Sequence, residues 1–324
     1  MINRRRRLLA LLAALASPFA ANAVNAADYP AKPIRLVVPF APGSLTDGVA
    51  RVLAEELTRE LGHAVIVDDK PGGSGIIAAE SVARGAADGY TLFVTTNTTH
   101  SANPSLFKKL PYDPVRDFVP IAQIGWVTFA LVVAPTLPVN TAAELVTHAR
   151  ANPGQLSYAT ANASSRVYGA TLANLIQVDM IEVPFKSSPQ AIAEIVSGRV
   201  SLGFADLFTS APQIRAKKVR ALAIASNRRS RLMPELATMQ EVGWSGFDLV
   251  SWVGLFAPAG TPEPIVQRLV LACQRALTRP GMRERIAGAG IDLAYGDHEA
   301  LRKLVAEQLL VWSRRIRAAK IEPE

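Results

Sequence analysis

Short apolar runs that alternate with helical patterns constrain this chain more than any other feature. Ile34–Val38 is an apolar run of strand length that ends at Pro39. After a turn, large apolar residues recur at helical spacing from Val49 to Leu61, and Gly62 ends that pattern. Further strands are predicted at 64–68, 91–95, 130–133, 157–160, 181–185, 202–205 and 220–225, with helices near 190–197 and 211–216. Three helices at 263–278, 281–289 and 297–317 close the chain. This alternation predicts an α/β fold with a largely parallel sheet.

Two longer apolar runs, 121–134 and 249–257, exceed the usual strand of about 5–6 residues. The chain has 324 residues, which suits two lobes of about 100–150 residues each. We interpret the long runs as two strands that cross between lobes, so that 126–250 forms one lobe and 27–125 with 251–324 forms the other. A single large sheet would also need long strands, and this alternative stays open.

Residues 1–26 have the pattern of a secretory signal peptide. Four arginines at 4–7 precede an apolar stretch at 8–15 and small residues up to Ala26, near which we expect cleavage. The apolar stretch is shorter than the roughly 20 residues that span a bilayer, and no cysteine near the cleavage site offers a lipid anchor. We therefore expect an exported protein, periplasmic in a bacterium and remote from cytoplasmic pools of ATP or NAD.

The charge and the cysteine content exclude several classes of function. The formal charge is +8 (35 − 27), and removal of the four leading arginines leaves +4 (8 − 4). The remaining basic pairs, at 217–218, 228–229 and 314–315, are scattered and lack interleaved aromatic residues, so we expect solvated faces and no nucleic-acid groove. Cys273 is the only cysteine of the sequence and lies in an apolar helical pattern, which predicts a buried filler and excludes an internal disulfide.

Three polar loops follow predicted strands: 42–47, 95–101 and 160–165. Ligands of open α/β sheets bind at the carboxyl ends of strands, where helix N-termini attract anions. The loops are dense in short hydroxyl and amide side chains, and they fall on both proposed lobes. Each loop alone is also explained by ordinary helix capping. Together they predict a cleft that holds an anion.

Motifs for catalysis are missing from the sequence. It contains no G-x-S-x-G, no H-E-x-x-H and no P-loop lysine motif, and its four histidines lack metal-ligand spacing. Only His100 lies in a candidate cleft loop, where we expect surface hydrogen bonding. Gly73-x-Gly75-x-x-Ala78 imitates a dinucleotide fingerprint, but Lys70 and Pro71 separate it from the preceding strand. We therefore predict a protein that is not an enzyme and has no catalytic residues, metal or cofactor.

Several long motifs resemble the extracytoplasmic receptors of tripartite tricarboxylate transporters, the Bug or TctC-like family. In chain order they are YPAKPIRLVVPFAPGSLTD, KPGGSGIIAAESVARGAADGYTL, NPSLFKKLPYDPVRDFVPIAQI, VPFKSSPQAIAEIVSGRV, IRAKKVRALAIAS and WVGLFAPAGTPEPIVQRL. The resemblance covers nearly all of the mature chain. It implies a two-lobed periplasmic binding fold with two crossing strands, capture of a small carboxylate, and membrane transporter subunits as partners. We expect a monomer.

The resemblance also implies which residues touch the ligand. Loops matching 42–47 and 160–165 hold one carboxylate from opposite lobes through backbone groups, hydroxyls and ordered waters, and the position at or before Asp206 sets specificity. The resulting candidate ligand-binding residues are Phe40, Gly43, Ser44, Leu45, Thr46, Asp47, Thr96, Thr99, Thr160, Ala161, Asn162, Ser164, Ser165, Lys186 and Asp206.

The chain departs from the family pattern where glycine, a small residue, histidine or aspartate is usual. The substituted positions are Ser44, Leu45, Ala161, Ala163, Tyr168 and Ala205. Alanine replaces such a glycine only if φ is negative there. Because Leu45 makes the pocket mouth more apolar, we expect a ligand less polar than citrate or aspartate, such as an aromatic or aliphatic mono- or dicarboxylate.

Three alternative functions compete with that of a transport receptor. A transcription regulator's effector domain would need a DNA-binding segment where the signal peptide lies, and a secreted hydrolase would need a nucleophile with its base. An orphan receptor of the same family, acting on a signalling partner instead of a transporter, stays open.

Overall fold

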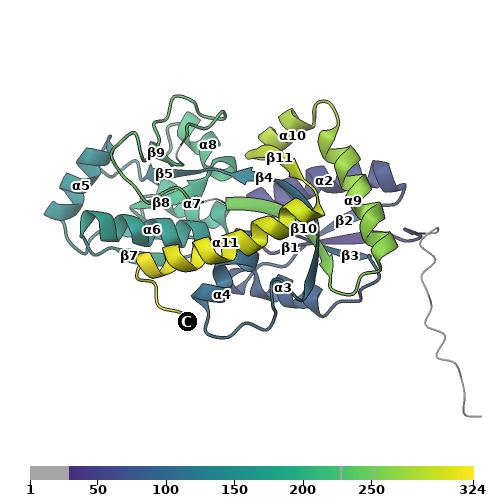
Figure 1. The fold of residues 1–324 in the computed structure, drawn as a ribbon. Coiled ribbons are helices and arrows are strands. Elements are labelled where there is room, and N and C mark those ends of the chain that lie inside the picture. The colour runs from purple at the N-terminus through teal and green to yellow at the C-terminus, as the bar shows by residue number, and fades with distance from the viewer. Residues whose placement is uncertain (1–28, 227, 250) are drawn as a thin grey trace, which may run out of the picture.

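The computed structural model describes residues 29–226, 228–249 and 251–324. The predicted signal peptide and its cleavage site lie outside these residues. The described chain forms two α/β lobes that lie side by side, each built around its own sheet (Figure 1). This confirms the predicted fold class.

The first lobe, lobe I, holds a six-stranded sheet in the order β11-β4-β10-β3-β1-β2. Its strands are β1 (Ile34–Val38), β2 (Val65–Asp69), β3 (Thr91–Thr96), β4 (Phe118–Val127), β10 (Ser251–Pro258) and β11 (Ile291–Gly296). Its helices are α2 (Leu45–Leu61), α3 (Ile76–Ala83), α4 (Asn103–Leu106), α9 (Glu263–Thr278) and α10 (Met282–Gly288), with short turns at Gly73–Gly75 and Thr98–Ala102. The apolar faces of α2 and α9 cover one side of this sheet, and Cys273 lies fully buried among them, as expected.

The second lobe, lobe II, holds a five-stranded sheet in the order β7-β6-β8-β5-β9. Its strands are β5 (Phe129–Val133), β6 (Ser157–Thr160), β7 (Ile181–Pro184), β8 (Leu202–Asp206) and β9 (Arg220–Ala225). Its helices are α5 (Ala142–Ala151), α6 (Ala163–Ile176), α7 (Ser188–Val196) and α8 (Leu207–Arg215).

The long apolar run 121–134 crosses between the lobes. It divides into β4 of the first sheet and β5 of the second, with only Thr128 between them. The second run contributes β10 to the first sheet, and the chain returns to it from β9 through a segment whose described residues, 226 and 228–249, form no strand. We infer lobe boundaries at Thr128 and within 226–250.

Neither sheet is largely parallel, contrary to the prediction. Pairs β1–β2, β1–β3, β6–β7 and β6–β8 are parallel, whereas β3–β10, β4–β10, β4–β11, β5–β8 and β5–β9 are antiparallel. The two crossings cause this difference, because a strand that enters a lobe from its neighbour runs against the βαβ units already there.

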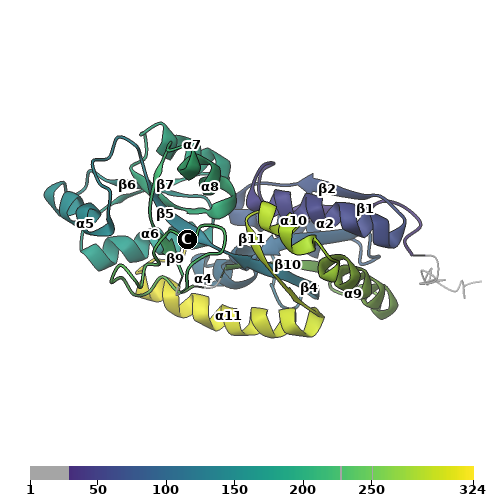
Figure 2. The same ribbon diagram turned by 90° about the horizontal axis from the view of Figure 1, so that it is seen from above.

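The long helix α11 (His298–Ala318) runs along both lobes (Figures 1 and 2). Leu301, Leu304 and Val305 pack with the first lobe, while Trp312 and Ile316 lie in the main core of the second. The predicted boundary at 251 assigns all of α11 to the first lobe, but the C-terminal half of this helix packs with the second lobe.

Three local predictions were incomplete. Strand β11 was missed, loop 95–101 contains a π-helical turn that continues into α4, and α8 begins at Leu207 instead of near 211. Pro212 within α8 conceals that start in the sequence, although the Asp206 side chain caps the helix by accepting from Thr209 N at 3.0 Å.

No described helix is long and apolar enough to cross a membrane.

Candidate functional site

The three polar loops predicted from the sequence meet at one small cavity of about 30 Å³ between the lobes. Its lining residues are Phe40, Ser44, Leu45, Thr46, Thr96, Asn97, Thr98, Val127, Phe129, Asn162, Ser164, Ser188, Asp206 and Ser251. We call it the central cavity. Because one water molecule needs at least 10–15 Å³ by this measure, the cavity has room for about two.

Helix N-termini from both lobes converge on the central cavity. Helix α2 begins beside Ser44 and α6 beside Asn162, while α7 and α8 begin at Ser188 and immediately after Asp206. The first four N–H groups of a helix have no partner within the helix, and its N-terminus carries about half a positive charge. Lys, Arg and His do not occur among the described lining residues, so positive potential here comes from backbone.

A carboxylate fixes the loop from the first lobe. Ser44 Oγ accepts from Asp47 N at 3.3 Å, and Asp47 Oδ2 accepts from Gly43 N at 2.8 Å. Arg51 Nε lies 2.8 Å from Asp47 Oδ1. Gly43 has φ +77°, a left-handed conformation that glycine adopts without strain. Asp47 is thus buried beneath the loop and shapes it, without lining the cavity.

The loop from the second lobe is fixed by a reciprocal cap. Asn162 Oδ1 accepts from Ser165 N at 3.0 Å, and Ser165 Oγ accepts from Asn162 N at 3.2 Å. Neither Ala161 nor Ala163 has a positive φ, so the backbone at these positions does not require glycine. Thr160 is directed elsewhere, because its Oγ1 donates to Glu182 Oε1 at 3.0 Å.

The two lobes are hydrogen-bonded to each other across the central cavity. Asn97 Nδ2 donates to Ser164 Oγ at 3.1 Å, and Ala163 N donates to Thr98 Oγ1 at 3.4 Å. Ser164 Oγ also lies 2.8 Å from the Oγ of Ser251, at the start of β10. All these groups are buried. The lobes therefore adopt a closed arrangement in this structure.

Asp206 is a buried carboxyl group in the lining. Burial raises its pKa, and hydrogen bonds from Thr209 and from the Ser188 side chain act in the opposite direction. A carboxylate here would repel an anionic ligand but would accept a hydrogen bond from a ligand hydroxyl or ammonium group.

The predicted site residues separate into two groups. Phe40, Ser44, Leu45, Thr46, Thr96, Asn162, Ser164 and Asp206 line the central cavity. The other candidates lie outside its lining. Gly43 and Asp47 shape the first loop, Ser165 caps α6, and Thr99 Oγ1 lies 2.7 Å from Thr95 Oγ1. Thr160, Ala161 and Lys186 line a neighbouring cavity.

Sequence reasoning missed six lining residues: Asn97, Thr98, Val127, Phe129, Ser188 and Ser251. Asn97 and Thr98 belong to the predicted polar loop and could have been included. Val127, Phe129 and Ser251 lie at the ends of β4, β5 and β10, and only the meeting of the two lobes brings them to the cavity.

Two larger cavities flank the central one. A cavity of about 530 Å³ shares Phe40 and Asn162 with it and includes Arg166 and Lys186. Another of about 800 Å³ shares Val127 and Ser251 and is bordered by residues 225–226 and 228–232 of the second lobe and by α10 and β11 of the first. A ligand larger than two waters therefore does not fit within the central cavity alone.

His100 does not lie at the surface, contrary to the prediction. It is fully buried, with its ring centroid 4.1 Å from that of Phe256, and Nδ1 lies 2.9 Å from Thr99 Oγ1. Burial lowers its pKa to about 3, so the imidazole stays neutral. It belongs to the aromatic core under β10.

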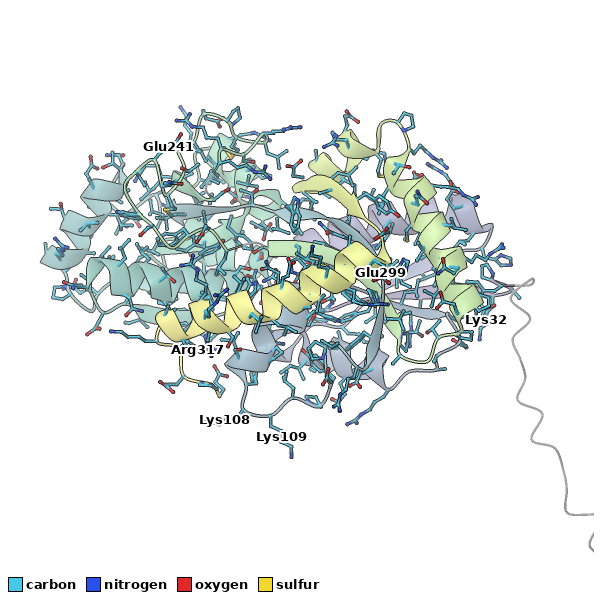
Figure 3. The ribbon with its side chains drawn as sticks, in the orientation of Figure 1. Lys32, Lys108, Lys109, Glu241, Glu299 and Arg317 are labelled. Atoms are coloured by element: carbon cyan, nitrogen blue, oxygen red, sulfur yellow. The ribbon has the colours of Figure 1, made fainter. Side chains whose placement is uncertain are left out.

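Exposed charges lie away from the central cavity. Lys108 and Lys109 project outward below α4, and Glu241 and Glu299 lie on the outer surfaces of the two lobes (Figure 3). The central cavity is instead lined by short polar side chains together with the apolar residues Phe40, Leu45, Val127 and Phe129.

Comparison with known proteins identifies the family. The sequence model of the TctC family, the tripartite tricarboxylate transporter family receptor, matches residues 49–321. The chain belongs to this receptor family. It is accordingly a substrate-binding protein and not an enzyme.

Three similar solved structures extend this finding. The periplasmic binding protein BugD is 34% identical, with a TM-score of 0.87 over 91% of this chain and 100% of its own. A protein from R. palustris solved with adipate is 31% identical, with a TM-score of 0.88 over 92% of this chain and 100% of its own. MatC from Rhodopseudomonas palustris, solved with bound malate, is 33% identical, with a TM-score of 0.83 over 89% of this chain and 100% of its own.

Proposed function

We propose that this receptor captures a small carboxylate in the central cavity and delivers it to a tripartite tricarboxylate-type membrane transporter. The observation that carries the proposal is the convergence of α2 and α6, from opposite lobes, on a buried pocket of hydroxyl and amide groups. Helix N-termini arranged in this way bind anions without a cationic side chain. Two of the similar structures were solved with adipate and malate, which are both dicarboxylates.

Binding proceeds by exchange of hydrogen bonds. In the closed structure Ser164 bonds to Asn97 and Ser251, and these groups become available to a ligand carboxylate once the lobes separate. Each hydrogen bond to a charged group contributes about 1.5–3 kcal/mol, and micromolar affinity needs about 8 kcal/mol. Four to six such bonds supply that affinity with some surplus for closure. Closure then joins the two lobes into one surface that a membrane partner recognises.

Apolar residues in the lining favour a carboxylate with an apolar body. Phe40, Leu45, Val127 and Phe129 border the central cavity together with its polar groups. An aliphatic or aromatic acid would place its charge at the helix N-termini and its carbon chain against these residues. We propose such acids over citrate.

Export follows from the proposed role, because a receptor of this kind meets its ligand outside the cytoplasm. The N-terminal segment has the composition of a signal peptide, and BugD is a periplasmic binding protein. We propose a periplasmic, monomeric receptor cleaved near Ala26.

Native mass spectrometry of the purified protein tests the capture step. We expect an added mass equal to a carboxylic acid, which disappears on mild denaturation and returns when the identified acid is added. An adduct that is a neutral compound or a cation would contradict the proposal. If no adduct is retained, the titrations described at the end of the Discussion decide the question.

A further inference from the structure

The side chain of Phe208 crosses from the second lobe into the first. Phe208 is the second residue of α8 and packs against the apolar core beneath α2 and β1. A Cβ atom placed on Gly48 would lie 3.1 Å from Phe208 Cζ. A Cβ atom placed on Gly290 would lie 2.5 Å from Phe208 Cβ and 2.7 Å from its backbone N. Gly48 thus faces the ring of Phe208 and Gly290 faces its Cβ and backbone, so two glycines of the first lobe form a socket for this residue.

Glycine at both positions serves the contact between lobes. Gly48 lies inside α2, where alanine would favour the helix by about 1 kcal/mol. Gly290 has φ +73° in the turn between α10 and β11. A side chain at either position would occupy space that Phe208 takes when the lobes are closed.

The socket is joined directly to the central cavity. Gly48 directly follows Asp47, which fixes the first loop. Phe208 lies two residues after Asp206, which lines the central cavity. Beside it, a Cβ atom on Gly43 would lie 4.0 Å from Pro189 Cγ of α7. The N-terminal ends of α2, α7 and α8 therefore meet at this contact as well as at the cavity.

We propose that Phe208 sets the affinity of the receptor without touching the ligand, by stabilising the closed form through the socket of Gly48 and Gly290. The inference rests on the proposed function, since it assigns a positioning residue to that binding step. A ligand bound between closed lobes leaves only after they open. Loss of the Phe208 contact therefore raises the dissociation rate and lowers the fraction of protein competent to hold the ligand.

The test compares Phe208→Ala, Gly48→Leu and the control Gly288→Leu. Gly288 is a helical glycine of α10 with nothing within 4 Å of its added Cβ, so leucine there meets open space. Adipate and malate serve as probes in calorimetry and stopped-flow dissociation. We expect Phe208→Ala and Gly48→Leu to raise Kd at least tenfold, chiefly through dissociation, and Gly288→Leu to change it less than twofold.

A double variant shows whether the two sites are in direct contact. Gly48→Leu with Phe208→Ala should bind more tightly than Gly48→Leu alone, because the leucine then fills the vacated space. Equal affinity of wild type, Phe208→Ala and Gly48→Leu would overturn the inference. If the wild type binds neither probe, small-angle scattering of the ligand-free proteins tests the role of Phe208 in closure independently of ligand binding. The inference then requires a larger radius of gyration for Phe208→Ala and Gly48→Leu than for wild type, and an equal radius would overturn it.

Discussion

Asn97 of the first lobe donates a hydrogen bond from Nδ2 to Ser164 Oγ of the second lobe at 3.1 Å. Ser164 is 1% exposed and also lies 2.8 Å from Ser251. One hydroxyl therefore joins the polar loop after β3, the N-terminus of α6 and the start of β10 in the first sheet. A ligand carboxylate placed there would replace contacts that the lobes otherwise make with each other.

Ser164 should be the most sensitive position of the second loop. Ser164→Leu places a bulky apolar group where the helix N-termini converge, and we expect it to weaken carboxylate binding at least tenfold in calorimetry. Thr160→Val is the control from the same loop, since Thr160 is directed toward Glu182, and its Kd should change less than threefold. Equal effects of both substitutions would remove Ser164 from the site.

Asp47 should couple loop shape to affinity. Asp47→Ala removes the acceptor for Gly43 N and the partner of Arg51, and we expect a loss of about 1–2 kcal/mol in the free energy of unfolding and a clear rise in Kd. Thr141→Ala is a matched control, because it removes the N-cap of α5, far from the cavity. The control should lose stability in urea and keep its affinity; a parallel loss of affinity in both would contradict the role of Asp47.

Asp206 should make binding pH-dependent. Burial raises its pKa, and a bound anion nearby would raise that pKa further. Protonation relieves the repulsion, so affinity for a simple dicarboxylate should increase as pH falls through the pKa of Asp206. Asp206→Asn should abolish this dependence and retain strong binding at neutral pH. Persistence of the same pH profile in the variant would show that another group is responsible.

Asp69 should destabilise the protein at neutral pH. Burial, followed by the nearby Asp47 carboxylate, raises the pKa of Asp69 to about 6, whereas Arg51 lowers it. Since the folded pKa lies above the unfolded value, the proton's contribution to stability is fully present below about pH 4 and is lost as pH rises through about 6. A shift of one pKa unit corresponds to about 1.4 kcal/mol, but solvent screens the repulsion between Asp69 and Asp47 and reduces the effect. We therefore expect Asp69→Asn to be more stable than wild type by about 1 kcal/mol at pH 7.5 in urea unfolding. The difference should disappear near pH 4; a difference that grows in acid would refute this reading.

Local pattern was sufficient for most of the fold. Strands such as Arg220–Ala225 and helices such as Glu263–Thr278 agree with the predicted bounds, because their apolar spacing matches the period of the element that forms. Strand β11 was missed because its residues, IDLAYG, pair with β4 across a large separation in sequence. His100 was misjudged because nothing in TTNTTHS indicates that the segment turns inward beneath Phe256.

The site was predictable where chemistry is local and unpredictable where it depends on the lobes meeting. Ser44 and Asn162 are recognisable as caps of helices that follow strands, so the two loops proposed to bind a carboxylate could be identified from the sequence. Ser251 and Phe208 have no local signal. Their roles arise only when residues far apart in the chain come together in the closed arrangement.

Calorimetric titration with acids and their neutral amides tests the central claim most directly. The series consists of adipate, malate, an aromatic monocarboxylate, citrate, and the diamides of adipate and malate. We predict saturable binding of at least one of the less polar acids with a Kd in the micromolar range or below, weaker binding of citrate, and no binding of the amides. Binding of a neutral diamide as tightly as its acid, or binding of none of the acids, would contradict the account of a carboxylate held by converging helix N-termini.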